Sequence, residues 1–296
     1  MNTIPAKTII TSKNDDSWFS MNYNMNLYRG CCHGCIYCDS RSSCYHVEDF
    51  DTVRAKENAI EIVESELRRK IKTGVIATGA MSDPYNPFEQ KYQLTRQALE
   101  LIDTYHFGIA IATKSNLITR DIDLLSRIKK HSPVLCKITI TSADDALSRI
   151  IEPGVCESSK RMEAIHQLSD AGIFTGILLM PLLPFITDTP ENVREIVHSA
   201  HENGAKFIYP AFGVTMRDGQ REWLYHELGN RFPDKPLAEL YQKYYGNKYM
   251  CKSPRAKELW KEFVTECDRC HILYQMEDIV AAYRRNYDYQ QLTFPF

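Results

Sequence analysis

Three cysteines near the start of the chain have a spacing that could hold an iron–sulfur cluster. Cys31, Cys35 and Cys38 form a C-x3-C-x2-C pattern, and cysteine thiolates are the usual ligands of such clusters. A cubane cluster has four irons, so three protein thiolates would leave one iron open toward a substrate or cofactor. Gly34 permits the backbone angles of a tight loop, and Tyr37 can cover one face of a cluster.

Two other interpretations of this loop need to be considered. It could be a zinc site, or simply a cysteine-rich loop in a reduced protein. A structural zinc ion usually takes four protein ligands, and no clean second C-x2-C pair follows at finger spacing. Cys32 could also replace Cys31, which would give a C-x2-C-x2-C pattern.

A second group of cysteines lies near the end of the chain. Cys267 and Cys270 have C-x2-C spacing, and Cys251 precedes them. With a fourth ligand such as His271, they could hold an auxiliary cluster. We favour the alternative that they are small core residues of amphipathic helices, because cysteine is among the residue types most often buried.

The elements that must position the first cysteine loop alternate between strands and helices. A period-two pattern predicts a strand over 21–28, and short apolar runs predict five more. Residues 216–296 are expected to form a helical C-terminal extension packed beside a core of 1–215. The expected strands are 21–28, 75–78, 108–113, 134–141, 174–180 and 206–211, and the main expected helices are 54–70, 118–130, 160–171, 237–245, 257–267 and 276–285, with others beginning near 95 and 189.

Six such alternations indicate an α/β fold with a parallel sheet built of right-handed crossovers. The sheet could be open and doubly wound, or it could curve into a barrel. In both architectures ligands bind at the carboxyl ends of the strands. The cysteine loop follows the first expected strand, so we expect it to face the ends of the other strands.

Polar residues follow several of the expected strands. Ser82 and Asp83 offer acceptors to an ammonium group, Lys114 could pair with a carboxylate, and Thr139 and Ser142 can donate hydrogen bonds. Each also has an ordinary interpretation: a turn broken by Asp–Pro, a solvated lysine, or hydroxyl residues favoured in strands. Their shared location supports a ligand site at that edge.

Composition narrows the class of protein. The chain has 296 residues, of which 36 are basic and 38 acidic, giving a formal net charge of −2. This balance argues against tight, non-specific binding of nucleic acid through bulk charge. No apolar run approaches the ~20 residues of a membrane span, and the first 18 residues lack the apolar core of a signal peptide. We therefore expect a cytoplasmic protein without a membrane segment, whose ten cysteines are ligands or core residues rather than disulfides.

The cysteine frame, with an aromatic residue just before its last cysteine, resembles the radical S-adenosylmethionine (SAM) superfamily. Residues 26–30 before it and Asp39 after it resemble the spore photoproduct lyase-like branch. The resemblance implies a partial (β/α)6 barrel, a [4Fe-4S] cluster and SAM, and it favours Cys31 over Cys32 as a ligand. In this superfamily SAM chelates the open iron, and one electron cleaves it to a 5′-deoxyadenosyl radical.

The resemblance also implies roles for individual residues. The segment after the second strand is expected to bind the amino group of SAM, residues 114 and 161 its carboxylate, and residues 139 and 142 its ribose or carboxylate. The expected set comprises the metal ligands Cys31, Cys35 and Cys38, the catalytic residue Tyr37, and the SAM-binding residues Ser82, Asp83, Lys114, Thr139, Ser142 and Arg161.

The chain departs from the lyase at two positions. The lyase has a hydrogen-donating cysteine just before its Ser–Asp pair, whereas this chain has Ala80 and Met81 there. Asp39 stands where the lyase has a second tyrosine. The resemblance therefore predicts cluster and SAM binding without predicting repair of thymine dimers.

Three functions remain as alternatives at this point. The first is a radical SAM enzyme that acts on nucleic acid, and the second is one that modifies a peptide or metabolite, which the lack of net positive charge favours. The third is a non-catalytic metal-binding or interaction protein. Either enzyme would need an external one-electron donor of the flavodoxin or ferredoxin type. The tail, residues 291–296, loosely resembles peptides that dock on sliding clamps.

Overall fold

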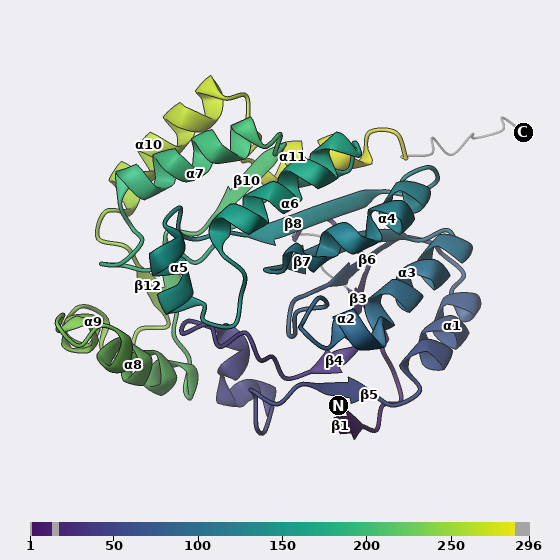
Figure 1. The fold of residues 1–296 in the computed structure, drawn as a ribbon, viewed down its shortest axis with the longest axis horizontal. Helices are drawn as coiled ribbons and strands as arrows, with labels where there is room; N and C mark the ends of the chain where they lie inside the picture. The colour runs from purple at the N-terminus through teal and green to yellow at the C-terminus, as the bar shows by residue number, and fades with distance from the viewer. Residues whose placement is uncertain (1, 14–17, 288–296) are drawn as a thin grey trace, which may run out of the picture.

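A sheet of six parallel strands forms the centre of the molecule (Figure 1). The computed structural model describes residues 2–13 and 18–287. The order β3-β6-β7-β8-β9-β10 follows the sequence, whereas a doubly wound sheet would reverse it, so the expected partial barrel is confirmed. A short antiparallel strand, β2, pairs with β3 at one edge. The strands of this sheet are β2 Ile10–Ser12, β3 Tyr23–Met25, β6 Val75–Thr78, β7 Gly108–Thr113, β8 Val134–Thr139, β9 Phe174–Leu179 and β10 Phe207–Pro210.

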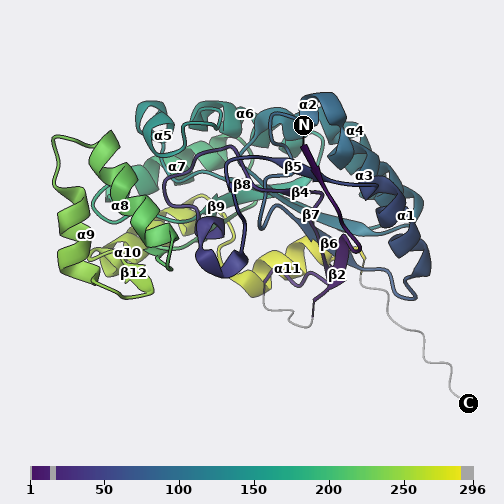
Figure 2. The ribbon, with the colours of Figure 1, turned by 90° about the horizontal axis from the view of Figure 1, so that it is seen from below.

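The crossover helices cover the outer face of this sheet. Figure 2 shows α1, α3, α4 and α6 on one side of it and α11 on the other. The strands β6, β7 and β8 are buried almost throughout, as expected for a parallel sheet covered on both faces. The helices before residue 216 are α1 Ala59–Arg69, α2 Glu89–Tyr92, α3 Leu94–Thr104, α4 Ile122–Ile128, α5 Asp145–Ile151, α6 Ser158–Asp170 and α7 Pro190–Glu202, with 3-10 turns η1 Asp39–Arg41, η2 Ser43–Tyr45 and η3 Asn116–Asp121.

A small second sheet supports the cysteine loop and corrects two predictions. It contains β1 Asn2–Ile4, β5 Arg54–Lys56 and β4 Tyr28–Arg29. The strand expected over 21–28 is therefore two short strands, and the helix expected from residue 54 begins only at Ala59. The start of that region is drawn into a sheet because Ala55 lies opposite both Thr3 and Tyr28 and is itself buried.

The C-terminal part is helical, as expected, but it is not entirely helical. It contains α8 Gln220–Arg231, α9 Leu237–Tyr245, α10 Ala256–Arg269 and α11 Met276–Arg284. The strand β12, Met250–Lys252, pairs with β11, Gly213–Thr215, and sequence patterning predicted neither this pair nor α8. The helix α10 packs on α7, where Phe263 and Cys267 join the main core cluster.

The helix α11 packs against the inner face of the sheet, near the amino ends of its strands. Ile279 and Tyr283 pack with Val75, Leu135 and Phe207. The Tyr283 hydroxyl donates to the carbonyl oxygen of Phe19 (2.6 Å). This end of the barrel is therefore filled, and the space that remains inside it lies toward the carboxyl ends of the strands.

Candidate functional site

The loop that carries Cys31, Cys35 and Cys38 lies between β4 and η1 and has its three thiols beside one cavity. All three cysteines are free. The loop begins at Gly30, whose φ is +79°, and a Cβ there would stand 2.4 Å from the carbonyl oxygen of Thr52. Only glycine avoids both the strain of a positive φ and the overlap with Thr52 at this position. The sharp turn brings the first cysteine toward the barrel.

The segment from Ile151 to Gly154 holds the cysteine loop from the other side. The amide of Ile36 donates to the carbonyl oxygen of Ile151 (3.0 Å), and the amide of Gly154 donates to that of His33 (2.9 Å). A Cβ at Gly154 would meet the backbone of residues 32 and 33 at 2.6–2.9 Å. The two backbones pack so closely that position 154 accommodates only glycine without movement.

A buried ionic pair lies directly behind Tyr37. The Tyr37 hydroxyl donates to the Glu152 carboxylate, which pairs with the Arg161 guanidinium (2.7 Å). Burial would raise the pKa of Glu152, but the charge of Arg161 holds that pKa below its ordinary value. Arg161 also donates to the carbonyl oxygen of Thr139 (2.7 Å) and to the hydroxyl of Ser148 (2.7 Å). Its guanidinium therefore lies in the protein interior and does not line the cavity.

Asp83 connects the ends of two neighbouring strands. Its carboxylate accepts from the Thr113 hydroxyl (2.6 Å), the Lys114 amide (2.8 Å) and the Tyr85 amide (2.9 Å). A carboxylate has about four acceptor positions, so capacity for a further donor remains. Beside it, the Ser82 hydroxyl donates to the carbonyl oxygen of Gly30 (2.6 Å). Ser82 thus links the segment after β6 to the start of the cysteine loop, and Asp83 links the same segment to the end of β7.

Lys114 places a positive charge on the wall of the cavity that the cysteines line. Its ammonium lies 5.6 Å from the centre of the Tyr37 ring. Burial would lower its pKa, but the Cys35 thiol and the Glu152 carboxyl raise the pKa above its usual value. The group therefore stays an ammonium, and Lys114 lines the cavity that the three cysteines share.

The predicted residues divide into two groups. The structure brings most of them to one cavity and leaves Ser142 and Arg161 outside it. Ser142 only closes its own turn, accepting from the Asp144 amide (3.2 Å), and Arg161 is committed to Glu152. The predicted residues that line the cavity are Cys31, Cys35, Tyr37, Cys38, Ser82, Asp83, Lys114 and Thr139.

The cavity suits an iron–sulfur cluster with a second ligand beside it. Its volume is about 570 Å³. Within residues 2–13 and 18–287, no group of three or more His, Cys, Asp or Glu side chains is arranged around a single metal ion. A cubane places each thiolate on a different iron, so three free thiols along one wall fit it better than they fit one ion.

The three thiols differ in how readily they ionise. Burial raises the pKa of Cys35 well above its usual value and also raises that of Cys38. Burial has the same tendency at Cys31, but the hydrogen bonds and the charge of His33 together outweigh it and lower the pKa of that thiol. A thiolate buried in such surroundings is stabilised by a bound cation.

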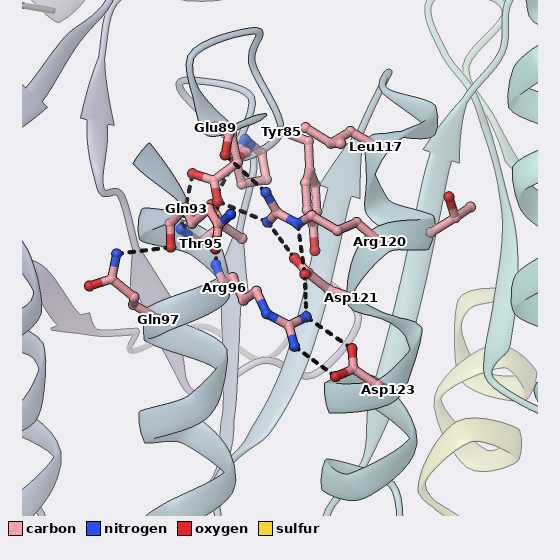
Figure 3. A network of polar contacts seen from close by, with 12 residues as sticks. Tyr85, Glu89, Gln93, Thr95, Arg96, Gln97, Leu117, Arg120, Asp121 and Asp123 are labelled. Atoms are coloured by element: carbon pink, nitrogen blue, oxygen red, sulfur yellow. Dashed lines mark hydrogen bonds and ion pairs between the residues drawn. The ribbon is translucent and has the colours of Figure 1, made fainter. Parts of the chain in front are cut away.

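A partly buried ionic network holds the helices around this edge of the barrel. Figure 3 shows Arg120 between the carboxylates of Glu89 and Asp121, and Arg96 between those of Asp121 and Asp123. Glu89 also accepts the amide of Thr95 at the start of α3 (3.0 Å). The Tyr28 hydroxyl donates to Glu89 as well, so the network connects α3 and η3 to the strand that leads into the cysteine loop.

The later cysteines do not form one group. Cys251 lies in β12, in the cluster around Leu224 and Tyr241. Cys267 belongs to the main core on α10, and Cys270 packs at its margin. These positions agree with the interpretation as core residues. The tail, residues 291–296, lies outside the described residues.

Sequence patterns do not reveal three residues that matter at this site. His33 lies among the cysteines of the loop, and no pattern singles it out. Its Nδ1 lies 3.6 Å from the Asp83 carboxylate. The segment 151–154 resembles the lyase-like branch, but that resemblance assigns no role to Glu152 itself, which pairs with Arg161. Lys137 lies within a strand, although a lysine in an otherwise apolar strand is itself a signal that could have found it. It too lines the cavity.

The structure is thus an open α/β barrel with three free thiols and a lysine beside one cavity. The family model described as the radical SAM superfamily matches residues 25–200. The chain belongs to the radical SAM superfamily. No helix among the described residues is long and apolar enough to cross a membrane.

Several relatives and solved structures are similar to the chain. An uncharacterized protein of Mycobacterium tuberculosis is 29% identical over 230 residues, covering 75% of this chain and 67% of that protein. Another, of Methanocaldococcus jannaschii, is 34% identical over 176 residues, covering 58% and 65%. A radical SAM Nalpha-GlyT isomerase of Pseudomonas phage M6 is 22% identical over 202 residues, covering 67% and 41%.

Among solved structures, a cysteine-to-serine variant of spore photoproduct lyase is similar with a TM-score of 0.65 at 16% identity, covering 90% of this chain and 78% of that one. The lyase complexed with dinucleoside spore photoproduct gives a TM-score of 0.61 at 16% identity, covering 88% and 76%. At this level of identity the likeness establishes the fold, which is the fold that the sequence resemblance implied.

Proposed function

We propose that this protein is an enzyme that binds a [4Fe-4S] cluster through Cys31, Cys35 and Cys38 and uses it to cleave SAM. When bound, the cluster supplies one electron to SAM, and the resulting 5′-deoxyadenosyl radical abstracts hydrogen from a substrate. The observation that carries this proposal is the arrangement of the three free thiols and Lys114 around one cavity at the strand ends. Family membership supports it independently.

The residues of the chain would divide the binding of SAM between them. Lys114 places a partly buried ammonium beside the cysteine loop, which suits a carboxylate. Asp83 keeps acceptor capacity after its three hydrogen bonds, and Ser82 keeps the lone pairs of its hydroxyl; both suit an ammonium. Thr139 lines the same wall and can donate to a ribose. Arg161 supports this wall from behind through its hydrogen bond to the carbonyl oxygen of Thr139.

Anaerobic reconstitution with iron and sulfide, followed by dithionite and SAM, tests the proposal. We expect 5′-deoxyadenosine from the wild-type protein and none above background from Cys35→Ala. Cys44→Ser is the matched control, because Cys44 is exposed and lies outside the frame. A cluster-loaded wild-type protein that yields no 5′-deoxyadenosine would defeat the enzyme proposal and favour a non-catalytic binding protein.

The relatives favour a substrate of nucleic-acid type over a free metabolite. One fold neighbour binds a dinucleoside spore photoproduct, while another, a methyltransferase from Kitasatospora setae with a TM-score of 0.53, has tryptophan as its substrate. The formal charge of −2 means that any nucleic acid would be held by local groups. The electron donor is proposed to be an external protein of the flavodoxin or ferredoxin type.

A further inference from the structure

Lys137 is a charged residue buried inside the barrel, and the chemistry proposed above does not use it. It lies in β8 between Leu135 and Thr139, and strand alternation places all three on the inner face. Leu135 packs in the inner cluster, whereas Lys137 and Thr139 line the cavity. Only 2% of Lys137 is exposed.

The ammonium of Lys137 has no carboxylate partner in the part of the chain that the structure describes. Its nearest polar contact is the sulfur of Met21, at 3.6 Å, and the ring of Phe19 lies 4.8 Å away. A thioether is a weak acceptor, and a ring face attracts a cation without replacing its hydration. A buried lysine in such surroundings is unfavourable unless something else satisfies it.

A second cation makes this part of the cavity more positive. Lys13, which follows β2, lines the same cavity. Burial lowers the pKa of Lys137 to about 7 despite an opposite effect of Cys136, and the charge of Lys13 makes a smaller contribution in the same direction as burial. Two lysines on one cavity wall repel each other, and an anion between them would stabilise both.

We propose that this inner part of the cavity binds an anionic group of the substrate, a phosphate or a carboxylate, through Lys137 with help from Lys13. The inference rests on the proposed function, because it assigns the substrate class of the same site. Lys114 at the cysteine loop remains the partner of SAM, so the two lysines divide the cavity into a cofactor part and a substrate part. The substrate is therefore an acidic molecule whose anionic group points into the barrel.

The contact with Phe19 suggests a simpler role, in which Lys137 only fills space. Methionine matches the lysine side chain closely without its charge, so Lys137→Met would keep the packing and remove the ammonium. If filling space is the only role, this variant should bind small anions as the wild-type protein does. The two explanations therefore differ in a measurable property.

The test is calorimetric titration of cluster-loaded, SAM-bound protein with inorganic phosphate and, separately, with acetate. We expect the wild-type protein to bind one of them, and Lys137→Met to bind it at least about tenfold more weakly, as for loss of a hydrogen bond to a charged group. Lys13→Met should bind the anion about two- to fivefold more weakly than the wild-type protein does. Lys130→Met, which removes one exposed charge, is the matched control and should match the wild type.

Each outcome has a defined meaning. Binding of phosphate points to a phosphorylated substrate, and binding of acetate alone points to a carboxylate. The proposal is overturned if neither anion binds the wild-type protein, or if Lys137→Met binds as tightly as Lys130→Met. If Lys137→Met does not fold, the variant of the half-buried Lys13 decides the question. Weaker anion binding by Lys13→Met supports the proposal, and unchanged binding overturns it. Anion binding needs no turnover, so failure to form 5′-deoxyadenosine would count against the proposed function alone.

Discussion

Side chains that lie behind the cavity hold the side chains that line it in position. Tyr37 lies at the cysteine loop, but its hydroxyl is held by the Glu152 carboxylate, which is held in turn by Arg161. All three are buried. Removing one member of a buried ion pair leaves the other charge without compensation. The position of Tyr37 therefore depends on a pair that contacts no ligand.

Glu152→Gln should destabilise the protein by about 3–5 kcal/mol, because it leaves the Arg161 guanidinium buried without a countercharge. Chemical unfolding measures this. Glu157→Gln is the control, since the Glu157–Lys160 pair lies at the surface, where ion pairs contribute little, and the unfolding free energy should barely change. Equal losses in the two variants would show that the buried pair has no special role.

The pH dependence of stability should carry the same signature. The folded protein holds the pKa of Glu152 below its ordinary value. The stability that this carboxylate contributes is thus complete above the unfolded pKa of about 4.3 and is lost as pH falls below it toward the folded value. Between about pH 6 and about pH 3 the wild-type protein should lose more stability than Glu152→Gln. Parallel curves would contradict this.

At the scale of elements, glycines set how closely the loops at the strand ends approach one another. Gly79, which follows β6, has a φ of +94°, and a Cβ there would stand 1.8 Å from the carbonyl oxygen of Ala112 in β7. The loop that carries Ser82 and Asp83 can reach the end of β7 only because this position has no side chain. Close backbone contacts therefore help to assemble the site.

Gly79→Ala should therefore cost at least about 2–3 kcal/mol, from strain at positive φ and from overlap with β7. Gly229→Ala is the matched control: Gly229 lies in α8, and a Cβ there would have no atom within 4 Å, so the change should stabilise the protein by about 0.5–1 kcal/mol. Thermal unfolding of both variants tests the expectation. A stable Gly79→Ala protein would mean that the two loops separate easily.

The sequence predicted many strands and helices well because the patterns that indicate them are local. The strand expected over 108–113 and the helix expected over 237–245 have those limits in the structure. The pairing of Ala55 with Thr3 and Tyr28 is non-local, so it could not be read from residues 54–56 themselves. The cysteine frame was likewise local, whereas the pairing of Arg161 with Glu152 depends on how α6 packs against the loop before it.

At the scale of the whole molecule, the C-terminal helices complete the barrel. The helix α10 packs on α7 with Arg194–Glu262 and His198–Glu266 pairs at its edge, and α11 fills the end of the barrel opposite the site. Hydrophobic contacts of this kind join elements that are far apart in the sequence into one core. The chain should therefore unfold as one cooperative unit.

Phe263→Ala tests that expectation. Phe263 is fully buried between α10 and α7, so its truncation should cost about 3–5 kcal/mol and lower a single transition detected alike by near- and far-ultraviolet circular dichroism. Trp260→Ala, at a position 43% exposed, should cost less. Two separate transitions in Phe263→Ala would instead show that the extension unfolds independently.

The central claim is that Cys31, Cys35 and Cys38 hold one cluster that binds SAM. Its most direct test is the iron content of reconstituted protein, combined with the electron paramagnetic resonance spectrum of the reduced protein before and after addition of SAM. We predict about four irons per chain and a SAM-dependent change of the spectrum in the wild type and in Cys32→Ser, with both lost when any of the three ligands is replaced by alanine. A full iron content in Cys35→Ala, or a spectrum that SAM leaves unchanged, would contradict the account.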